Sequence, residues 1–177
     1  PRDSLETAYS QVNWPARFQD ISSQASGSHP YLLDAAHNPS GLQRVLAQLE
    51  QRIKATSENG GQGWSLLFGT SPQHDLATFC QPLMSLCACY PPRTIVLTEP
   101  QGGRYPAVPN ATLHALTWPC STVTAIALPS DAVEYFSTQT PENVGLIISL
   151  GSLYLQGNLL ECFGHTSDEH LSLLAKQ

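Results

Sequence analysis

Short runs of hydrophobic residues alternate along this chain with longer segments in which hydrophobic residues recur at helical spacing. The runs have the continuous apolar character of strands buried on both faces of a sheet, and they span residues 31–33, 64–69, 94–98, 122–128 and 144–150. Apolar residues three or four positions apart predict helices within residues 40–53, 75–86, 129–136 and 153–162, with a further short helix around His114. Strands that alternate with helices indicate βαβ units. We therefore expect an α/β fold: a three-layer Rossmann-like domain with a mostly parallel sheet and helices on both faces.

The N-terminal part of the chain departs from this alternation. Residues 1–13 resemble a linker or the tail of a preceding segment. Phe18 and Ile21 then predict a short strand, which we expect at one edge of the sheet and antiparallel to its neighbour. Residues 22–28 are rich in serine and glycine and predict a loop. The α/β domain is expected to cover residues 14–165, with a C-terminal tail at 166–177.

Local signals place the helix starts and one turn. Ser40, followed by Gln43 three residues later, has the spacing of a capping box and predicts the start of the first long helix. Asp75 is a candidate cap for the next helix, which Pro82 is expected to kink or to delay. The Asn-Gly-Gly sequence at residues 59–61 predicts a turn.

Composition and charge narrow the functional classes. Hydrophobic residues make up 41% of the 177 residues and charged residues 12%, so the chain is not of the charge-rich disordered type. The net charge is -6, and the basic residues do not cluster, which argues against nucleic acid as a partner. No run approaches the roughly 18 apolar residues that cross a bilayer. A small molecule or another protein domain is the expected partner.

The five cysteines show no CxxC spacing, which favours free thiols in a reducing compartment over a zinc site. We therefore expect a cytoplasmic protein. The chain begins with Pro1 and its only methionine is Met84. This pattern predicts a piece cut from a longer polypeptide.

Candidate chemistry gathers where predicted strands end, because ligands of open α/β sheets collect at the carboxyl ends of the strands. Asp34 follows the first buried run, and its carboxylate is suited to accept two ribose hydroxyls, although a plain turn residue fits equally well. His37 and Asn38 add donors and acceptors in the same turn. Ser152 follows a glycine at another strand end, where backbone amides either cradle an anion or form a tight turn. We expect Asp34, His37 and Ser152 on one rim of the sheet.

Two further positions have a chemical and a structural interpretation. The guanidinium of Arg17 is suited to form a forked contact with phosphate, or its stem packs on Trp14 while its head is solvated. His74 and Asp75 form either an acid–base couple or a helix cap with a bystander histidine. The chain contains neither GxxxxGK[ST] nor GxGxxG, so it cannot by itself cradle a triphosphate in the Walker manner, and a dehydrogenase-type domain is disfavoured.

Four sequence blocks, taken in order, carry a family resemblance. WPAR at residues 14–17 stands where the family has WPGR, and LLDAAHNP at 32–39 stands where it has LLDGAHNP. The Phe-Gly pair at 68–69 precedes the family's DKD segment, and GSLYLQG at 151–157 matches GSLYLxG. The chain therefore resembles the C-terminal domain of the folylpolyglutamate synthase and dihydrofolate synthase family, within the Mur ligase superfamily.

The resemblance implies a reaction and a division of labour. ATP would phosphorylate the terminal carboxylate of a folate, and the amine of L-glutamate would attack the acyl phosphate to give a γ-glutamyl amide. An N-terminal domain of the same polypeptide would supply the P-loop and the ligands of Mg²⁺. The present domain would close over ATP through Arg17 and Asp34. His37, Asn38 and Ser152 would face the cleft near glutamate.

Two departures from the family pattern bear on this expectation. Ala16 and Ala35 replace glycines, which costs little unless those positions need a positive φ. Gln73 and His74 stand where the family has the first aspartate and the lysine of DKD. The alternative function is therefore a degenerate ligase-like domain that serves as a non-catalytic nucleotide-binding or protein-interaction module.

Two experimental expectations follow from the sequence. The chain alone should show no ligase activity, because phosphoryl transfer needs a phosphate cradle and a metal. Replacing Arg17 or Asp34 by alanine should impair the complete enzyme without destabilising this domain, if both residues lie at the surface.

Overall fold

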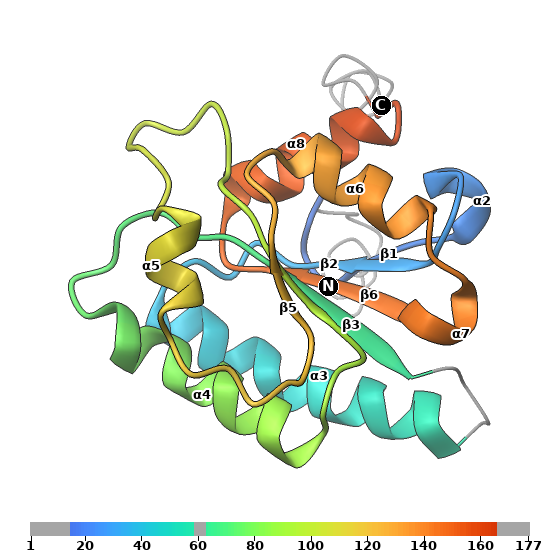
Figure 1. Cartoon of the computed structure of the whole chain (residues 1–177), viewed down its shortest axis with the longest axis horizontal. Coiled ribbons are helices and arrows are strands. Elements are labelled where there is room, and N and C mark those ends of the chain that lie inside the picture. Colours follow the sequence, from blue (N-terminus) through green and yellow to red (C-terminus); the bar gives the residue numbers. More distant parts are fainter. Residues whose placement is uncertain (1–14, 59–62, 166–177) are drawn as a thin grey trace, which may run out of the picture.

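A computed structural model describes residues 15–58 and 63–165, so Trp14, the predicted linker and tail, and the predicted turn at 59–61 lie outside the described residues. Within the described part, six strands form one sheet in the order β1-β2-β6-β3-β4-β5 (Figure 1). Only the β1–β2 pair is antiparallel, and it lies at one edge. The strands are β1 (Gln19–Ile21), β2 (Tyr31–Leu33), β3 (Trp64–Phe68), β4 (Ile95–Leu97), β5 (Val123–Ala125) and β6 (Leu146–Leu150). The predicted fold class and its antiparallel edge strand are confirmed.

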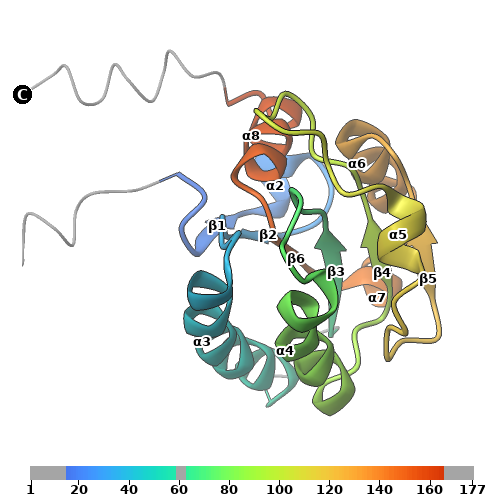
Figure 2. The same ribbon diagram turned by 90° about the vertical axis from the view of Figure 1, so that its left-hand side faces the viewer.

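Helices cover both faces of the sheet, as Figure 2 shows. Helices α3 and α4 lie against one face, and α6 and α8 lie against the other, while α5 packs near β4 and β5. The helices are α2 (Ser23–Ser26), α3 (Pro39–Glu58), α4 (Leu76–Cys89), α5 (Asn110–His114), α6 (Pro129–Ser137), α7 (Pro141–Val144) and α8 (Leu153–Cys162). The predicted three layers, with helices on both faces of the sheet, are thus confirmed.

Alternate residues of the central strand β6 pack into two separate hydrophobic cores, one on each face of the sheet. Ile148 and Leu150 belong to the core under α3 and α4, whereas Ile147 belongs to the core under α6 and α8. A strand that is buried on both faces favours apolar residues on both sides. Four of the five residues of β6 are apolar, and the exception, Ser149, is also buried. The helical spacing in α3 is also confirmed, since Leu42, Val45, Leu49 and Ile53 are buried and Leu46 packs against the same core while partly buried.

Two short helices were missed by the sequence patterns. Residues 22–28 contain α2, because the Ser22 hydroxyl accepts the amide of Ala25 at 3.2 Å and Gly27, at φ 77°, ends the single turn. The predicted strand at 144–150 starts later, at Leu146. The cause is α7, which Pro141 opens at a position where proline is favoured.

The start of α3 also differs from the capping-box prediction. The helix begins at Pro39, and the Oδ1 atom of Asn38 accepts the amide of Gly41 at 2.8 Å. Asn38 therefore caps the helix, and Ser40 lies inside the first turn. Asp75 caps α4 as predicted, by accepting the amide of Thr78 at 3.0 Å. That helix continues through Pro82, so its start is not delayed.

All five cysteines are free, as expected from their spacing. Cys80 and Cys87 are buried in the core under α4. Burial raises the pKa of each of these two thiols to about 12. Cys89 is exposed on α4.

Candidate functional site

The carboxyl ends of three adjacent parallel strands meet at one rim of the sheet. Leu33 of β2 and Leu67 of β3 both pair with Ser149 of β6, which puts the three strand ends side by side. The amide of Asp34 donates to the carbonyl of Ser149 at 3.1 Å, one residue beyond the end of β2. The prediction that Asp34, His37 and Ser152 lie at the same end of the sheet is confirmed.

Two glycines allow β3 and β6 to end in close contact. Gly151 has φ 105°, and a Cβ atom there would lie 2.6 Å from the carbonyl oxygen of Gly69. A Cβ atom on Gly69 would lie 2.4 Å from the carbonyl oxygen of Thr98. Neither position can accept a side chain without a backbone shift. These glycines therefore explain the Phe-Gly and Gly-Ser sequences at the two strand ends.

Asp34 is buried, with 8% of its surface exposed. Its Oδ1 atom accepts the amide of Ala36 at 2.8 Å, and its Oδ2 atom accepts the amide of Phe18 at 2.9 Å. The carboxylate thus joins the end of β2 to the segment before β1. The expectation that Asp34 lies at the surface is wrong, because backbone amides on two segments enclose its carboxylate.

Arg17 lies between two residues of strained backbone. Ala16 has φ 58° and Phe18 has φ 49°, and both are non-glycine residues in the left-handed region. Such strain persists only where the surrounding structure enforces it, and it is concentrated at ligand sites. Here two hydrogen bonds enforce it: Phe18 donates to Asp34, and the amide of Ala35 donates to the carbonyl of Ala16 at 2.8 Å.

The two alanines that replace family glycines therefore differ. Ala16 occupies a positive φ, so the family's glycine would be conformationally easier there. Ala35 has no positive φ and is fully buried, so a methyl group fits at that position. The departure costs conformational energy at Ala16 alone.

We call residues 16–18 the strained turn. A cavity of about 510 Å³ lies between this turn and α3. Arg17, Phe18 and Asp34 line it from one side. The opposite side is one face of α3, on which Gly41, Arg44, Val45 and Gln48 recur at helical spacing. Sequence reasoning missed Arg44 and Gln48. Their spacing identifies their common face, but only the fold brings the Arg17 turn to that face.

His37 and Asn38 are exposed at the same rim and differ in how their side chains are engaged. The Nδ1 atom of His37 lies 2.8 Å from the carbonyl oxygen of Ala35. Because a carbonyl only accepts, Nδ1 donates in this contact, and Nε2 is the ring nitrogen left for a ligand. Asn38 uses Oδ1 to cap α3, which leaves its amide nitrogen as the donor.

The loop after β3 is tied to this histidine turn. The amide nitrogen of Gln73 donates to the carbonyl of His37 at 3.2 Å and to the hydroxyl of Thr70 at 3.2 Å. Gln73 stands where the family has an aspartate, and a carboxylate could not make these donations. His74 is exposed, and its neighbour Asp75 caps α4. The geometry supports the helix cap over an acid–base couple.

Ser152 is buried, with 1% of its surface exposed. Its hydroxyl accepts the amides of Tyr154 at 3.1 Å and Leu155 at 3.5 Å, and it thereby caps α8. We expected the Ser152 side chain to face the cleft, but in the fold it is buried instead. Burial and two amide donors hold Ser152 at the start of the helix.

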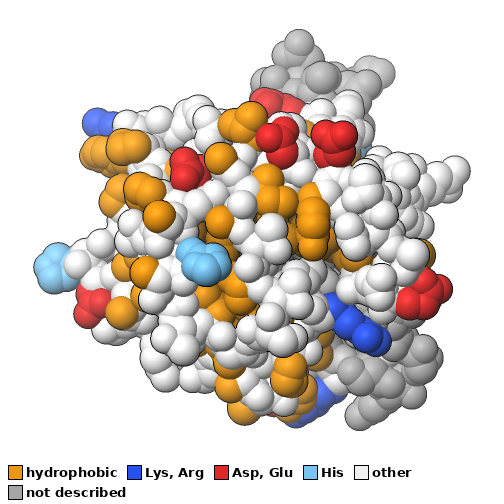
Figure 3. Space-filling view, viewed as in Figure 1, with side chains coloured by type: hydrophobic (Ala, Val, Ile, Leu, Met, Phe, Trp, Pro, Cys, Tyr) orange, Lys and Arg blue, Asp and Glu red, His pale blue; other side chains and the backbone are white. Residues whose placement is uncertain are grey.

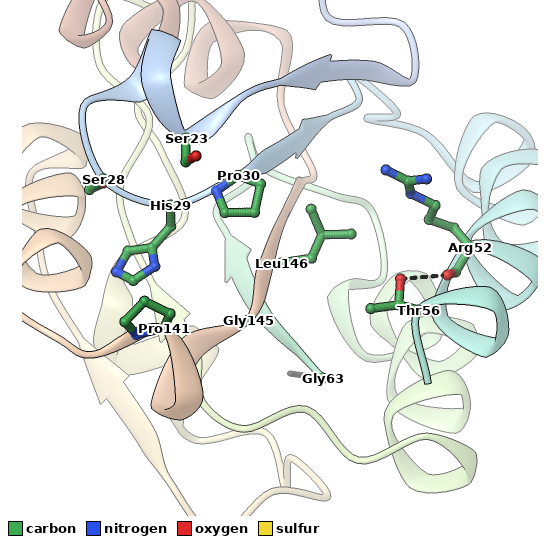
Figure 4. A pocket seen from close by; sticks show the side chains of 10 residues that line it. All are labelled: Ser23, Ser28, His29, Pro30, Arg52, Thr56, Gly63, Pro141, Gly145 and Leu146. Atoms are coloured by element: carbon green, nitrogen blue, oxygen red, sulfur yellow. Dashed lines mark hydrogen bonds between the residues drawn. The ribbon is translucent and has the colours of Figure 1, made fainter. Parts of the chain in front are cut away.

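A second cavity, of about 390 Å³, lies at the opposite end of the sheet (Figure 4). Its charged and titratable groups already have partners in the fold. Arg52 forms an ion pair with Asp20 at 2.8 Å, and the Nε2 atom of His29 donates to the carbonyl of Phe136 at 2.9 Å, near the end of α6. These groups stabilise the fold, which makes the cavity at the Arg17 rim the better candidate site.

Figure 3 shows the Lys and Arg side chains of one face lying apart from one another among acidic, polar and apolar side chains. Over residues 15–58 and 63–165, no three His, Cys, Asp or Glu side chains are grouped so that they could hold a metal ion. No helix in that part of the chain combines the length and apolarity needed to cross a membrane.

The sequence matches no protein-family model and no curated protein. The fold, in contrast, is shared with solved ligases. A bifunctional folylpolyglutamate synthase/dihydrofolate synthase from Yersinia pestis c092, complexed with AMPPNP and Mn ion, matches with a TM-score of 0.66 and 16% identity. MurF ligase from Thermotoga maritima, in complex with ADP, matches with a TM-score of 0.52 and 11% identity.

Both matches cover 93% of this chain, but they cover only 35% and 33% of the two enzymes. The chain thus spans about a third of the length of either neighbour. Both neighbours belong to the Mur ligase superfamily. This chain therefore shares its fold with about a third of each of these two ligases.

Proposed function

We propose that this chain is the C-terminal, nucleotide-closing domain of an ATP-dependent ligase that adds L-glutamate to a folate. The observation that carries the proposal is the cavity at the carboxyl rim. Two arginines, Arg17 and Arg44, line it beside a strained turn, and neither forms an ion pair with any other described residue. Unpaired guanidinium groups at a cavity suit the phosphates of a nucleotide.

Arg17 is the residue that we assign to the nucleotide. A guanidinium offers five donors in a planar fork, which matches the oxygens of a phosphate. Asp34 supports this contact by holding the amide of Phe18, and its position in the cavity wall also brings it near the bound nucleotide. The nucleotides named for the two structural neighbours, AMPPNP and ADP, agree with this assignment.

His37 and Asn38 are assigned to the incoming glutamate. The Nε2 atom of His37, the ring nitrogen that the described residues leave without a partner, is available to accept a hydrogen bond from the amino group of the amino acid, and the amide nitrogen of Asn38 suits one of its carboxylates. Ser152 acts indirectly, by fixing the start of α8 at the same rim. In the proposed reaction that amino group attacks a folyl acyl phosphate, forms the amide bond and releases inorganic phosphate.

The chain needs a partner domain for this chemistry. Its sequence has no P-loop, which the cradling of the triphosphate requires. We therefore assign the phosphate cradle and the metal ligands to an N-terminal P-loop domain of the same polypeptide. Closure of one domain on the other would assemble the site.

The experiment that tests the proposal follows ADP release with ATP, a folate and L-glutamate. The complete polypeptide should turn over, and the isolated chain should not. In the complete polypeptide, Arg17→Ala should lower kcat/KM by about tenfold to a hundredfold, because a charge-assisted hydrogen bond contributes about 1.5–3 kcal/mol. ADP release by the isolated chain, or full activity of the Arg17→Ala enzyme, would refute the assignment.

A further inference from the structure

Arg44 differs from the other cationic side chains of the same helix. On α3, Arg52 pairs with Asp20 at 2.8 Å, and Lys54 pairs with Glu50 at 2.8 Å. Arg44, in contrast, forms no ion pair with a described residue and lines the cavity at the Arg17 turn. The helix thus neutralises its cations at one end and leaves one available at the rim.

Asp34, the acidic residue that lines the same cavity, does not form an ion pair with Arg44. Its two oxygens instead accept the amides of Phe18 and Ala36. Two guanidinium groups on the walls of one cavity repel each other when nothing lies between them. Such a pair becomes favourable when a multiply charged anion binds between the two groups.

We propose that Arg44 is a second phosphate-binding residue, which forms with Arg17 a two-arginine clamp on the polyphosphate group of the ligand. Identification of that ligand as a nucleotide rests on the proposed function, but the clamp itself requires only a polyphosphate. Arg44 and Arg17 approach from different elements, α3 and the strained turn. The clamp therefore also holds those two elements together when the anion is bound.

The test measures binding of inorganic tripolyphosphate, ATP and adenosine to the chain by calorimetry or NMR titration. Arg44→Gln should weaken the binding of tripolyphosphate and ATP by about tenfold or more, which corresponds to about 1.4 kcal/mol. The binding of adenosine should not change. The matched control is Arg104→Gln, which removes the same charge from an exposed loop residue that does not line the cavity. Both variants should melt like the parent chain, since both side chains are exposed.

The outcomes separate the clamp from the proposed function. Unchanged tripolyphosphate binding in Arg44→Gln, or an equal loss in Arg104→Gln, would overturn the clamp. An equal loss of adenosine binding in Arg44→Gln would also overturn it, because Arg44 would then act on the nucleoside. If the chain bound tripolyphosphate in an Arg44-dependent way but did not bind ATP, the clamp would stand and the nucleotide assignment would fail.

Discussion

The Oδ2 atom of Asp34 accepts the backbone amide of Phe18 at 2.9 Å, across 16 residues of sequence. This bond fastens the strained turn that carries Arg17 to the carboxyl end of β2. The other carboxylate oxygen accepts the amide of Ala36, so Asp34 holds two backbone segments in one arrangement. Asp34 is therefore a positioning residue for Arg17, whatever direct contact it makes with a ligand.

Asp34→Ala should destabilise the chain by about 2–3 kcal/mol, because it leaves two backbone amides without their charged acceptor. Urea unfolding of the isolated chain measures this loss. Asp20→Ala is the control: it removes an exposed aspartate whose bond to Arg52 is a surface ion pair, and it should cost less than about 1 kcal/mol. Equal stability of Asp34→Ala and the parent chain would show that the carboxylate does not hold the turn.

Ala16→Gly should stabilise the chain by about 0.5–1 kcal/mol, because glycine adopts a positive φ without a steric cost. Ala35→Gly is the matched control, since Ala35 is fully buried and has no positive φ. That second change should destabilise the chain by a similar amount. The pair is compared by thermal or urea denaturation, and loss of stability in Ala16→Gly would contradict the strained turn.

The two glycines of GSLYLQG should respond to alanine in opposite directions. Gly151→Ala should cost about 2 kcal/mol or more, because its φ is 105° and a Cβ atom would meet the carbonyl of Gly69. Gly157→Ala should stabilise the chain by about 0.5–1 kcal/mol, because Gly157 lies in α8 with open space around it. Parallel denaturation curves of the two variants check the prediction. The same sign for both would contradict the rim packing.

Acid should selectively weaken the cap of α4. Hydrogen bonds from the amide and then the hydroxyl of Thr78 hold the pKa of Asp75 below its ordinary value. A depressed pKa in the folded state contributes stability above the unfolded-state pKa of about 3.9, and that contribution is lost as pH falls through the folded-state pKa. Asp75→Asn keeps a capping oxygen without the charge. The parent should exceed this variant in stability near neutral pH, and the gap should close in acid; a gap independent of pH would count against the charged cap.

Much of the fold is encoded in local pattern. The continuous apolar run that became β6 and the helical spacing of Leu42 and Leu49 in α3 predicted buried elements, because burial on two faces or one face leaves a direct periodic signature. The rim position of Asp34 followed from the parallel sheet. Local pattern could not show which of several nearby polar side chains would cap a helix. Asn38 displaced Ser40 as the cap of α3, and Ser22 closed a helical turn inside an expected loop.

The candidate site was predicted only in part, for a different reason. Arg17 and Asp34 were found because each lies in a recognisable sequence block. Arg44 lies in no such block, and its distance along the chain from Arg17 hides the cavity that they share. The positive φ of Ala16 is likewise imposed by hydrogen bonds from distant segments. Tertiary contacts create both the shared cavity and the positive φ of Ala16, so no local sequence pattern predicts them.

The most direct test of the nucleotide assignment is an NMR titration with ATP of the complete polypeptide, isotopically labelled in this domain. The account predicts saturable shifts of the backbone amides around Arg17, Asp34 and Arg44, and it predicts that Arg17→Gln weakens the binding of ATP by about tenfold or more. Groups around His29 and Arg52, at the opposite cavity, should not respond. If ATP caused no shifts, or shifted only the amides around His29 and Arg52, the carboxyl rim would not be a nucleotide site.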